Sequence, residues 1–228
     1  MNPHISEQYD AELDETRNLL MEMGGQVEKL LRDAIDALVT QDSALAEEVR
    51  RGDKKVNRLE VEIDEHCVNI IARRQPAASD LRTLISVMKA STDLERIGDE
   101  AGRIAKMAKV LADMEYPSDQ YNDFRTLANM THDLLTRSLD AFARLDADGA
   151  LAVIAADETI DDTYDQILRN RSSAMRQDPG TVERAMSVIW AARSLERIGD
   201  HAKNLGEHVV YLVRGQDVRH SPKQSSVS

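Results

Sequence analysis

Aromatic residues are scarce in this chain, which has one Trp, five Tyr and two Phe among 228 residues. Prolines and glycines are also few, with five and ten respectively, so long stretches run without a helix breaker. Ala, Leu, Glu, Asp and Arg are abundant instead, and most of these residues lose little side-chain freedom in a helix. The composition therefore predicts an all-α protein.

Cysteine is nearly absent, since Cys67 is the single one. One cysteine excludes an intramolecular disulfide and a CxxC zinc site, which is typical of a protein in a reducing compartment. The first residues, MNPHISEQYDAELDE, carry acids where a signal peptide has bases, and no window approaches about 18 uninterrupted apolar residues. We expect a cytoplasmic protein.

The chain also has no excess of basic residues, and its formal net charge is -12. A molecule with this charge repels phosphate backbones and anionic lipid headgroups. The charge therefore argues against nucleic acid as a partner.

Apolar residues recur with a helical period in six segments, and no segment alternates like a strand. The predicted helices span residues 8–40, 43–74, 78–114, 119–146, 148–176 and 180–214. Short breaks with turn and N-cap residues separate them, so sequential helices should be antiparallel. Residues 215–228 are polar and aperiodic and predict a disordered tail.

The hexapeptide LERIGD occurs twice, at residues 94–99 and 195–200. Further matches accompany it, including Met23 with Met130, Ala34 with Ala141, Asp53 with Asp157, and Gln75 with Gln177. These matches predict two tandem three-helix bundles, at residues 8–115 and 118–214, with the boundary near Tyr116 to Ser118.

Each hexapeptide places two carboxylates one helical turn apart, Glu95 with Asp99 and Glu196 with Asp200. Both pairs lie beside the apolar stripe that should face the bundle core. Like charges at this spacing destabilise a helix by a few tenths of a kcal/mol. Because both units carry this destabilising pair, we expect the carboxylates to have a function.

The preceding helix of each unit carries more oxygen donors on a comparable flank. They are Asp53, Asn57, Glu60 and Asp64 in the first unit and Asp157, Asp161 and Asp165 in the second. If these flanks face the hexapeptide carboxylates, each bundle holds an oxygen-rich patch suited to hard cations such as Mg²⁺, Mn²⁺, Ca²⁺ or ferric iron. The alternative is a solvated acidic face balanced by Arg96, Arg103, Lys106 and Lys203.

The sequence lacks the common catalytic motifs, with no P-loop, no glycine-rich dinucleotide fingerprint and no GxSxG elbow. No Glu-x-x-His pair accompanies the acids, and we interpret the scattered His66, His132, His201 and His208 as polar residues on helix surfaces. We expect no enzyme. A metal-dependent hydrolase and a metal-storage scaffold are the alternatives that the acidic residues leave open.

Helices 78–114 and 180–214 have apolar residues off their core stripes, among them Ile85, Met88, Met186 and Trp190. Helices that are apolar on several sides are buried on several sides. We therefore expect the N-terminal halves of these two helices to pack against each other. Trp190 should lie at this seam or in the contact of a homodimer, which is the oligomeric state we expect.

The pattern GDKKVNRLEVEID…ARRQPAASDLRTLISVMKASTDLERIGDEAGRIAK, echoed by ADETIDDTYDQIL…SLERIGDHAKNLGEHVVYL, resembles the PhoU family of phosphate-signalling regulators. The resemblance covers residues 8–214. It implies surface metal clusters of Fe, Mn, Mg, Zn or Ca ions, held by Glu95 with Asp99, Glu196 with Asp200, and Asp157 with Asp161. The first-unit counterpart of the last pair is Asp53 with Asn57, a weaker ligand pair, so equal occupancy of both sites does not follow.

The resemblance also implies a function. Proteins of this family repress phosphate-starvation genes and restrain phosphate uptake when phosphate is plentiful. They are thought to act as adaptors between the ATPase subunit of a phosphate ABC transporter and a sensor histidine kinase. Any membrane association of this chain should then be peripheral and through these partners.

Overall fold

The computed structural model describes residues 3–114 and 121–219 of the chain, and within them all regular structure is helical. The helices are α1 (Pro3–Thr40), α2 (Ser43–Arg74), α3 (Ala78–Ala112), α4 (Asn122–Arg144), α5 (Ala147–Gln177) and α6 (Val182–Arg214), with a short 3₁₀ turn, η2 (Pro179–Thr181), before α6. The predicted all-α fold and its six helices are confirmed. The largest difference is α1, which begins five residues earlier than the pattern predicted.

Equivalent caps begin α2 and α5. Asp42 accepts hydrogen bonds from the backbone N–H groups of the residues two and three positions further on, and Asp146 does the same for α5. These bonds satisfy amides that have no partner inside the helix. The same capping geometry at matching positions shows that the internal repeat extends to the helix ends.

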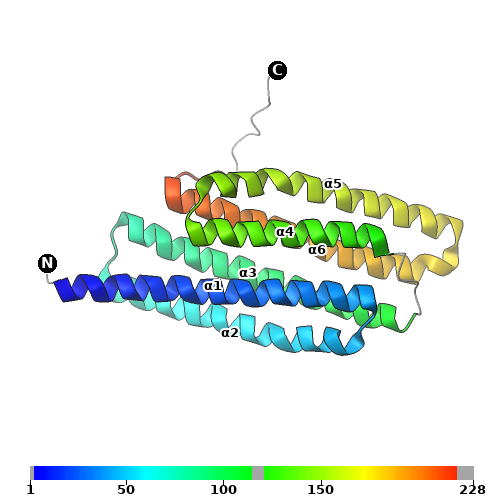
Figure 1. The fold of residues 1–228 in the computed structure, drawn as a ribbon, viewed down its shortest axis with the longest axis horizontal. Coiled ribbons are helices and arrows are strands. Elements are labelled where there is room, and N and C mark those ends of the chain that lie inside the picture. Colours follow the sequence, from blue (N-terminus) through cyan, green and yellow to red (C-terminus); the bar gives the residue numbers. More distant parts are fainter. Residues whose placement is uncertain (1–2, 115–120, 220–228) are drawn as a thin grey trace, which may run out of the picture.

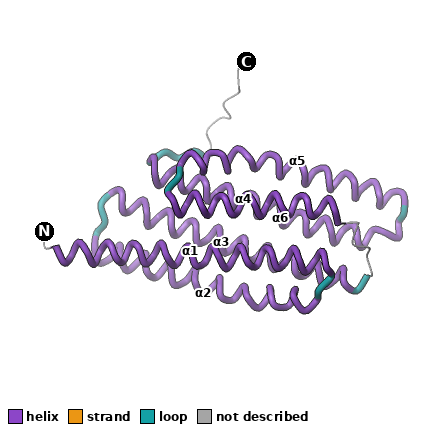
Figure 2. Tube along the Cα trace, viewed as in Figure 1, coloured by secondary structure: helices purple, strands orange, loops and turns teal. Residues whose placement is uncertain are grey.

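The six helices form two antiparallel three-helix units, α1–α2–α3 and α4–α5–α6, as Figure 1 shows. The connections lie at the ends of the long rods (Figure 2), as the short loops predicted. The boundary predicted near Tyr116 to Ser118 lies outside the described residues. Residues 215–219 follow α6 without regular structure, and Val218 packs partly against the core.

The two units pack against each other in two layers. In one layer the helices follow the order α2, α3, α6, α5; the other layer contains α1 and α4, which touch each other. The contact between α3 and α6 is the most extensive between the units, and the buried apolar residues of both units form one continuous core. Each repeat therefore depends on the other for the burial of one face.

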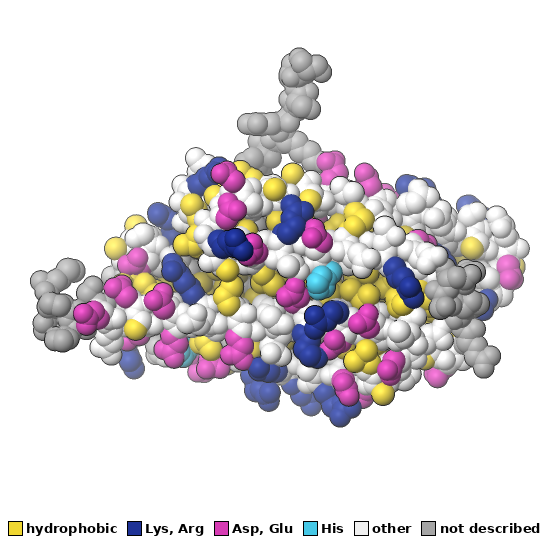
Figure 3. Space-filling model, in the orientation of Figure 1, with side chains coloured by type: hydrophobic (Ala, Val, Ile, Leu, Met, Phe, Trp, Pro, Cys, Tyr) yellow, Lys and Arg dark blue, Asp and Glu magenta, His cyan; other side chains and the backbone are white. Residues whose placement is uncertain are grey.

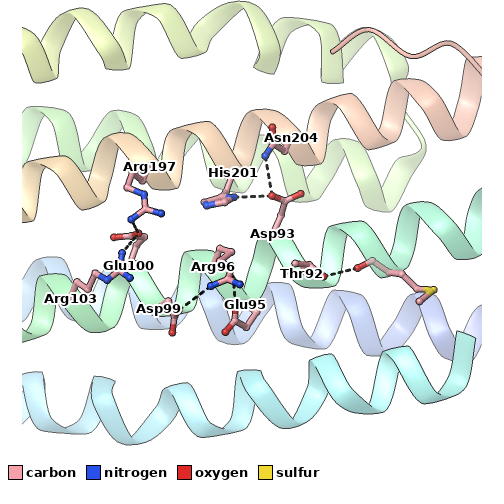
Figure 4. A network of polar contacts seen from close by, with 11 residues as sticks. Thr92, Asp93, Glu95, Arg96, Asp99, Glu100, Arg103, Arg197, His201 and Asn204 are labelled. Atoms are coloured by element: carbon pink, nitrogen blue, oxygen red, sulfur yellow. Dashed lines mark hydrogen bonds and ion pairs between the residues drawn. The ribbon is translucent and has the colours of Figure 1, made fainter. Parts of the chain in front are cut away.

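A polar cluster centred on Asp93 lies in the α3–α6 seam, as Figure 4 shows. The carboxylate of Asp93 lies 2.8 Å from His201 Nδ1 and 2.8 Å from His208 Nε2, and it accepts a 3.0 Å hydrogen bond from the Asn204 amide. Burial alone would raise the pKa of Asp93, but these three bonds outweigh burial and lower the pKa to about 2. The cluster therefore holds a charged aspartate between the two repeats.

A second polar contact crosses the seam two turns further along α3. Glu100 is buried, and its Oε1 lies 2.5 Å from Arg103 Nη1 and 2.6 Å from Arg197 Nη1 of α6. Figure 4 shows two arginines reaching Glu100, Arg103 from the same helix and Arg197 from α6. A buried carboxylate requires such partners, because an unpaired buried charge is strongly destabilising. The seam is thus fixed in register by polar contacts as well as by apolar packing.

Three expectations about α3 and α6 differ from the structure. The helices are antiparallel, so the N-terminal half of α3 meets the C-terminal half of α6, as the contact of Asp93 with His208 shows. Trp190 is 58% exposed, so it does not lie at the seam between the repeats, and its place in the contact of a homodimer stays a prediction. His201 and His208 are not ordinary surface residues, because both point into the seam and His208 is only 8% exposed.

The face over α1 and α4 carries mixed charges. Figure 3 shows acidic and basic side chains interspersed there, with apolar side chains between the two helices. The excess of negative charge is therefore not concentrated on this face. Among the described residues, no helix is both long enough and apolar enough to cross a membrane.

Replacing Asp93 should destabilise the molecule, because D93A leaves two histidines and an amide without their common acceptor. We expect the free energy of unfolding to fall by about 2–4 kcal/mol at pH 7, as measured by urea denaturation. D140A is the matched control, because Asp140 is 55% exposed in its pair with Arg144, and it should cost less than about 0.5 kcal/mol. Equal effects of the two variants would contradict a structural role for the cluster.

The stability difference between wild type and D93A should depend on pH. The folded pKa of Asp93, about 2, lies below the unfolded value of about 4. Its stabilising contribution is therefore complete above pH 4 and is lost as the pH falls from about 4 to 2. Wild type and D93A should accordingly converge in stability over this range by roughly 2 kcal/mol.

Candidate metal sites

The repeated hexapeptide divides the surface of α3 and α6 into faces. Leu94, Ile97 and Ala101 of α3 are fully buried, as are Leu195, Ile198 and Ala202 of α6, which confirms the predicted core stripes. In Figure 4, Glu95 and Asp99 point away from α6 toward the α2 side of α3. The carboxylates of α3 thus lie on its α2 side, and those of α6 lie on its α5 side.

The first carboxylate site consists of Asp53 and Glu60 from α2 with Glu95 and Asp99 from α3. The pKa of Glu95 is raised, first by burial and next by the neighbouring charge of Asp99. Burial and then the charge of Asp99 also raise the pKa of Asp53. Burial raises the pKa of Glu60, with a further contribution from Asp64. The predicted α2 and α3 flanks therefore do face each other and repel.

Little positive charge balances this first site. Arg96 Nε lies 3.4 Å from Glu95 Oε2, and its Nη1 lies 3.8 Å from Asp99 Oδ2, while its side chain is 54% exposed. Asp53 Oδ1 is buried and has no hydrogen-bond partner. An orphaned buried carboxylate oxygen is costly and marks a position where a cation would be stabilised.

The second carboxylate site consists of Asp157 and Asp161 from α5 with Glu196 and Asp200 from α6. Burial, followed by the charge of Asp157, raises the pKa of both Asp161 and Asp200. The pKa of Glu196 is raised by burial and next by Asp200. The four predicted residues of the second unit are therefore brought together.

Basic side chains contact the second site more closely. Lys203 Nζ lies 2.8 Å from Asp157 Oδ2, and Arg193 Nη1 lies 2.6 Å from Glu196 Oε1. Arg193 also lies over the ring of Tyr164, 5.7 Å from its centroid. The other oxygens, Asp157 Oδ1 and Glu196 Oε2, are buried without hydrogen-bond partners.

Glycine allows the helices of each site to approach closely. A Cβ on Gly98 would lie 3.1 Å from Asp53 Oδ1, and one on Gly199 would lie 3.4 Å from Asp157 Oδ1 and 3.2 Å from Ile160. The distances of 3.1 Å at Gly98 and 3.2 Å at Gly199 leave little room for a side chain. The glycine of LERIGD therefore sets the separation between the aspartate of the preceding helix and the hexapeptide helix.

The donor set fits a hard cation, because it consists of carboxylate oxygens and includes buried ones without partners. Among the described residues, no three Asp, Glu, His or Cys side chains are already grouped so that they could hold a metal ion. An ion would therefore have to draw the carboxylates together. Asn57 and Asp165, from the predicted flanks, are exposed.

The sequence model of the PhoU domain matches the chain twice, over residues 20–108 and 124–209. A Pseudomonas putida protein named phosphate-specific transport system accessory protein PhoU homolog is 52% identical over 217 residues, which cover 95% of this chain and 85% of that protein.

Two solved structures are similar to this chain. The crystal structure of PhoU from Pseudomonas aeruginosa has a TM-score of 0.89 and 48% identity, covering 91% of this chain and all of the other. The phosphate transport system regulatory protein PhoU from Streptococcus pneumoniae has a TM-score of 0.85 and 28% identity, covering 92% and 99%. The similarity thus spans both repeats.

Removing one repelling carboxylate should stabilise the metal-free protein. The raised pKa of Asp53 means that its charged form opposes folding above about pH 4, and this cost disappears as the pH falls below about 4. D53N should therefore raise the free energy of unfolding at pH 7, by up to about 1 kcal/mol after solvent screening, with no gain at pH 3. Urea denaturation in a chelator measures both values.

The D140N variant provides the comparison for this experiment, since Asp140 is 55% exposed and pairs with Arg144 on its own helix. It should change stability by less than about 0.5 kcal/mol. A D53N protein that is less stable than wild type at pH 7 would show that Asp53 is held by favourable contacts and is not repelled.

Proposed function

Because the chain belongs to the PhoU family, we propose that it regulates phosphate transport as an accessory protein of a phosphate-specific transport system. The observation that carries this proposal is that the PhoU domain is matched in both repeats. The duplicated carboxylate sites and the α3–α6 seam fall within the matched residues. The proposal therefore applies to the whole two-repeat unit and not to one half of it.

In its finer form, we propose a negative regulator that acts by binding proteins. Its partners would be the ATPase subunit of a phosphate ABC transporter and a sensor histidine kinase, which it would contact from the cytoplasm. The net charge of -12 favours protein partners over nucleic acid. Long helices with exposed faces on both repeats provide separate surfaces for two partners.

We also propose that the carboxylate sites bind metal ions and that this binding has a structural or regulatory role. Metal chemistry would supply positive charge to groups of carboxylates that repel one another. The raised pKa values of Glu95, Glu196 and Asp200 support this, as do the orphaned buried oxygens. Catalysis is not part of the proposal, because similar proteins are named accessory or regulatory proteins of a phosphate transport system.

Loss of the protein should switch on the phosphate-starvation response. In a deletion strain grown in abundant phosphate, we expect a starvation-promoter reporter to rise about tenfold or more, and the restored wild-type gene should silence it again. The magnitude corresponds to a shift of roughly 1.4 kcal/mol in the controlling equilibrium. A reporter that is unaffected by the deletion would contradict the role of a negative regulator.

Carboxylate substitution should reduce metal binding without unfolding the helices. For D99A with D200A we expect Mn²⁺ affinity to fall about tenfold or more, because each replacement removes an oxygen ligand and a negative charge. Equilibrium dialysis measures the bound metal, and far-ultraviolet circular dichroism checks the helicity. D133A with D140A, two exposed positions on α4, is the control. Unchanged metal content in D99A with D200A would exclude these residues as ligands.

A further inference from the structure

The two carboxylate sites differ in the basic side chains beside them. Alignment of the two LERIGD segments places Gly102 of α3 opposite Lys203 of α6. Lys203 Nζ lies 2.8 Å from Asp157 Oδ2, so the second site contains a fixed positive charge. At Gly102 an added Cβ would meet nothing within 4 Å, so the corresponding space beside the first site is open.

The partners of the two equivalent aspartates differ accordingly. Asp157 is 2% exposed, and a carboxylate as deeply buried as this needs a counter-charge, which Lys203 provides. Asp53, its first-repeat equivalent, has a buried Oδ1 without any hydrogen-bond partner.

The arginines beside the two sites also give the second site more positive charge than the first. Arg193 of the second site makes a 2.6 Å contact with Glu196 and is stacked on Tyr164. Its first-repeat equivalent is Thr92, which is uncharged. In the first site Arg96 makes only the longer contacts of 3.4 and 3.8 Å and is largely exposed. The first site therefore has more uncompensated negative charge.

We propose that Lys203 is a built-in counter-ion of the second carboxylate site, so that a divalent cation binds preferentially to the first site. An ion entering the second site must displace the ammonium or bind beside it, and either costs affinity. This inference rests on the proposed metal binding and specifies which repeat provides it. In this proposal the bound ammonium weakens the second site more than the amide of Asn57 weakens the first.

Mn²⁺ titration calorimetry on the full chain tests the inference. Wild type should bind with one tight phase that D99N weakens about tenfold or more and D200N leaves nearly unchanged. K203M should add a second phase of similar affinity, and D200N in the K203M background should remove it. G102K should weaken the first phase about tenfold or more, and it introduces no clash, since the space is open.

K109M is the matched control, because Lys109 is 42% exposed and pairs with Glu47 between α2 and α3, apart from both sites. It should leave the Mn²⁺ titration unchanged. Two equally tight phases in wild type, or a single phase lost in D200N, would overturn the role of Lys203 while metal binding itself stood. No Mn²⁺ binding by wild type, K203M or K109M would instead overturn the metal proposal on which the inference rests.

Discussion

The antiparallel packing of α3 on α6 is the contact on which the rest of the architecture depends. These two helices carry the repeated hexapeptide, and each buries its apolar stripe in its own unit while presenting another face to the other repeat. The core is continuous across this contact, so neither unit completes its burial alone. Two charged groups of α3 within the seam, Asp93 and Glu100, each take partners from α6. Register and packing are therefore fixed by the same set of residues.

Placing the seam on one face leaves another face of each hexapeptide helix for the carboxylates. Glu95 and Asp99 lie beside α2, and Glu196 and Asp200 lie beside α5, so the two sites lie on opposite sides of the seam. Residues next to one another in sequence thus serve different contacts: Asp99 belongs to a carboxylate site, while Glu100 bridges the repeats. The first carboxylate site and the seam are therefore connected through adjacent residues of α3.

The two carboxylate sites share the same helix geometry and differ in the charges around it. Gly98 and Gly199 maintain the same close approach of helices, and Asp53 and Asp157 occupy the same position against them. Around this constant frame, Gly102 and Thr92 are replaced by Lys203 and Arg193, which contact the acids of the second site. The same backbone geometry therefore surrounds two unequal electrostatic environments, and the proposed cation preference rests on this difference in charge.

The sequence by itself determined the helical class, the six helices, the duplication and the carboxylate pairs, because all of these depend on local periodicity and on residues within one or two turns. Only the tertiary structure decided how the helices meet. The direction of α6 relative to α3 reversed the expected contact of their N-terminal halves, exposed Trp190 and buried His208. The spacing of Arg197, His201, Asn204 and His208 along one face of α6 was visible in the sequence, but their acceptors lie about 100 residues away. Long-range pairing of charges depends on helix packing, which no local pattern encodes.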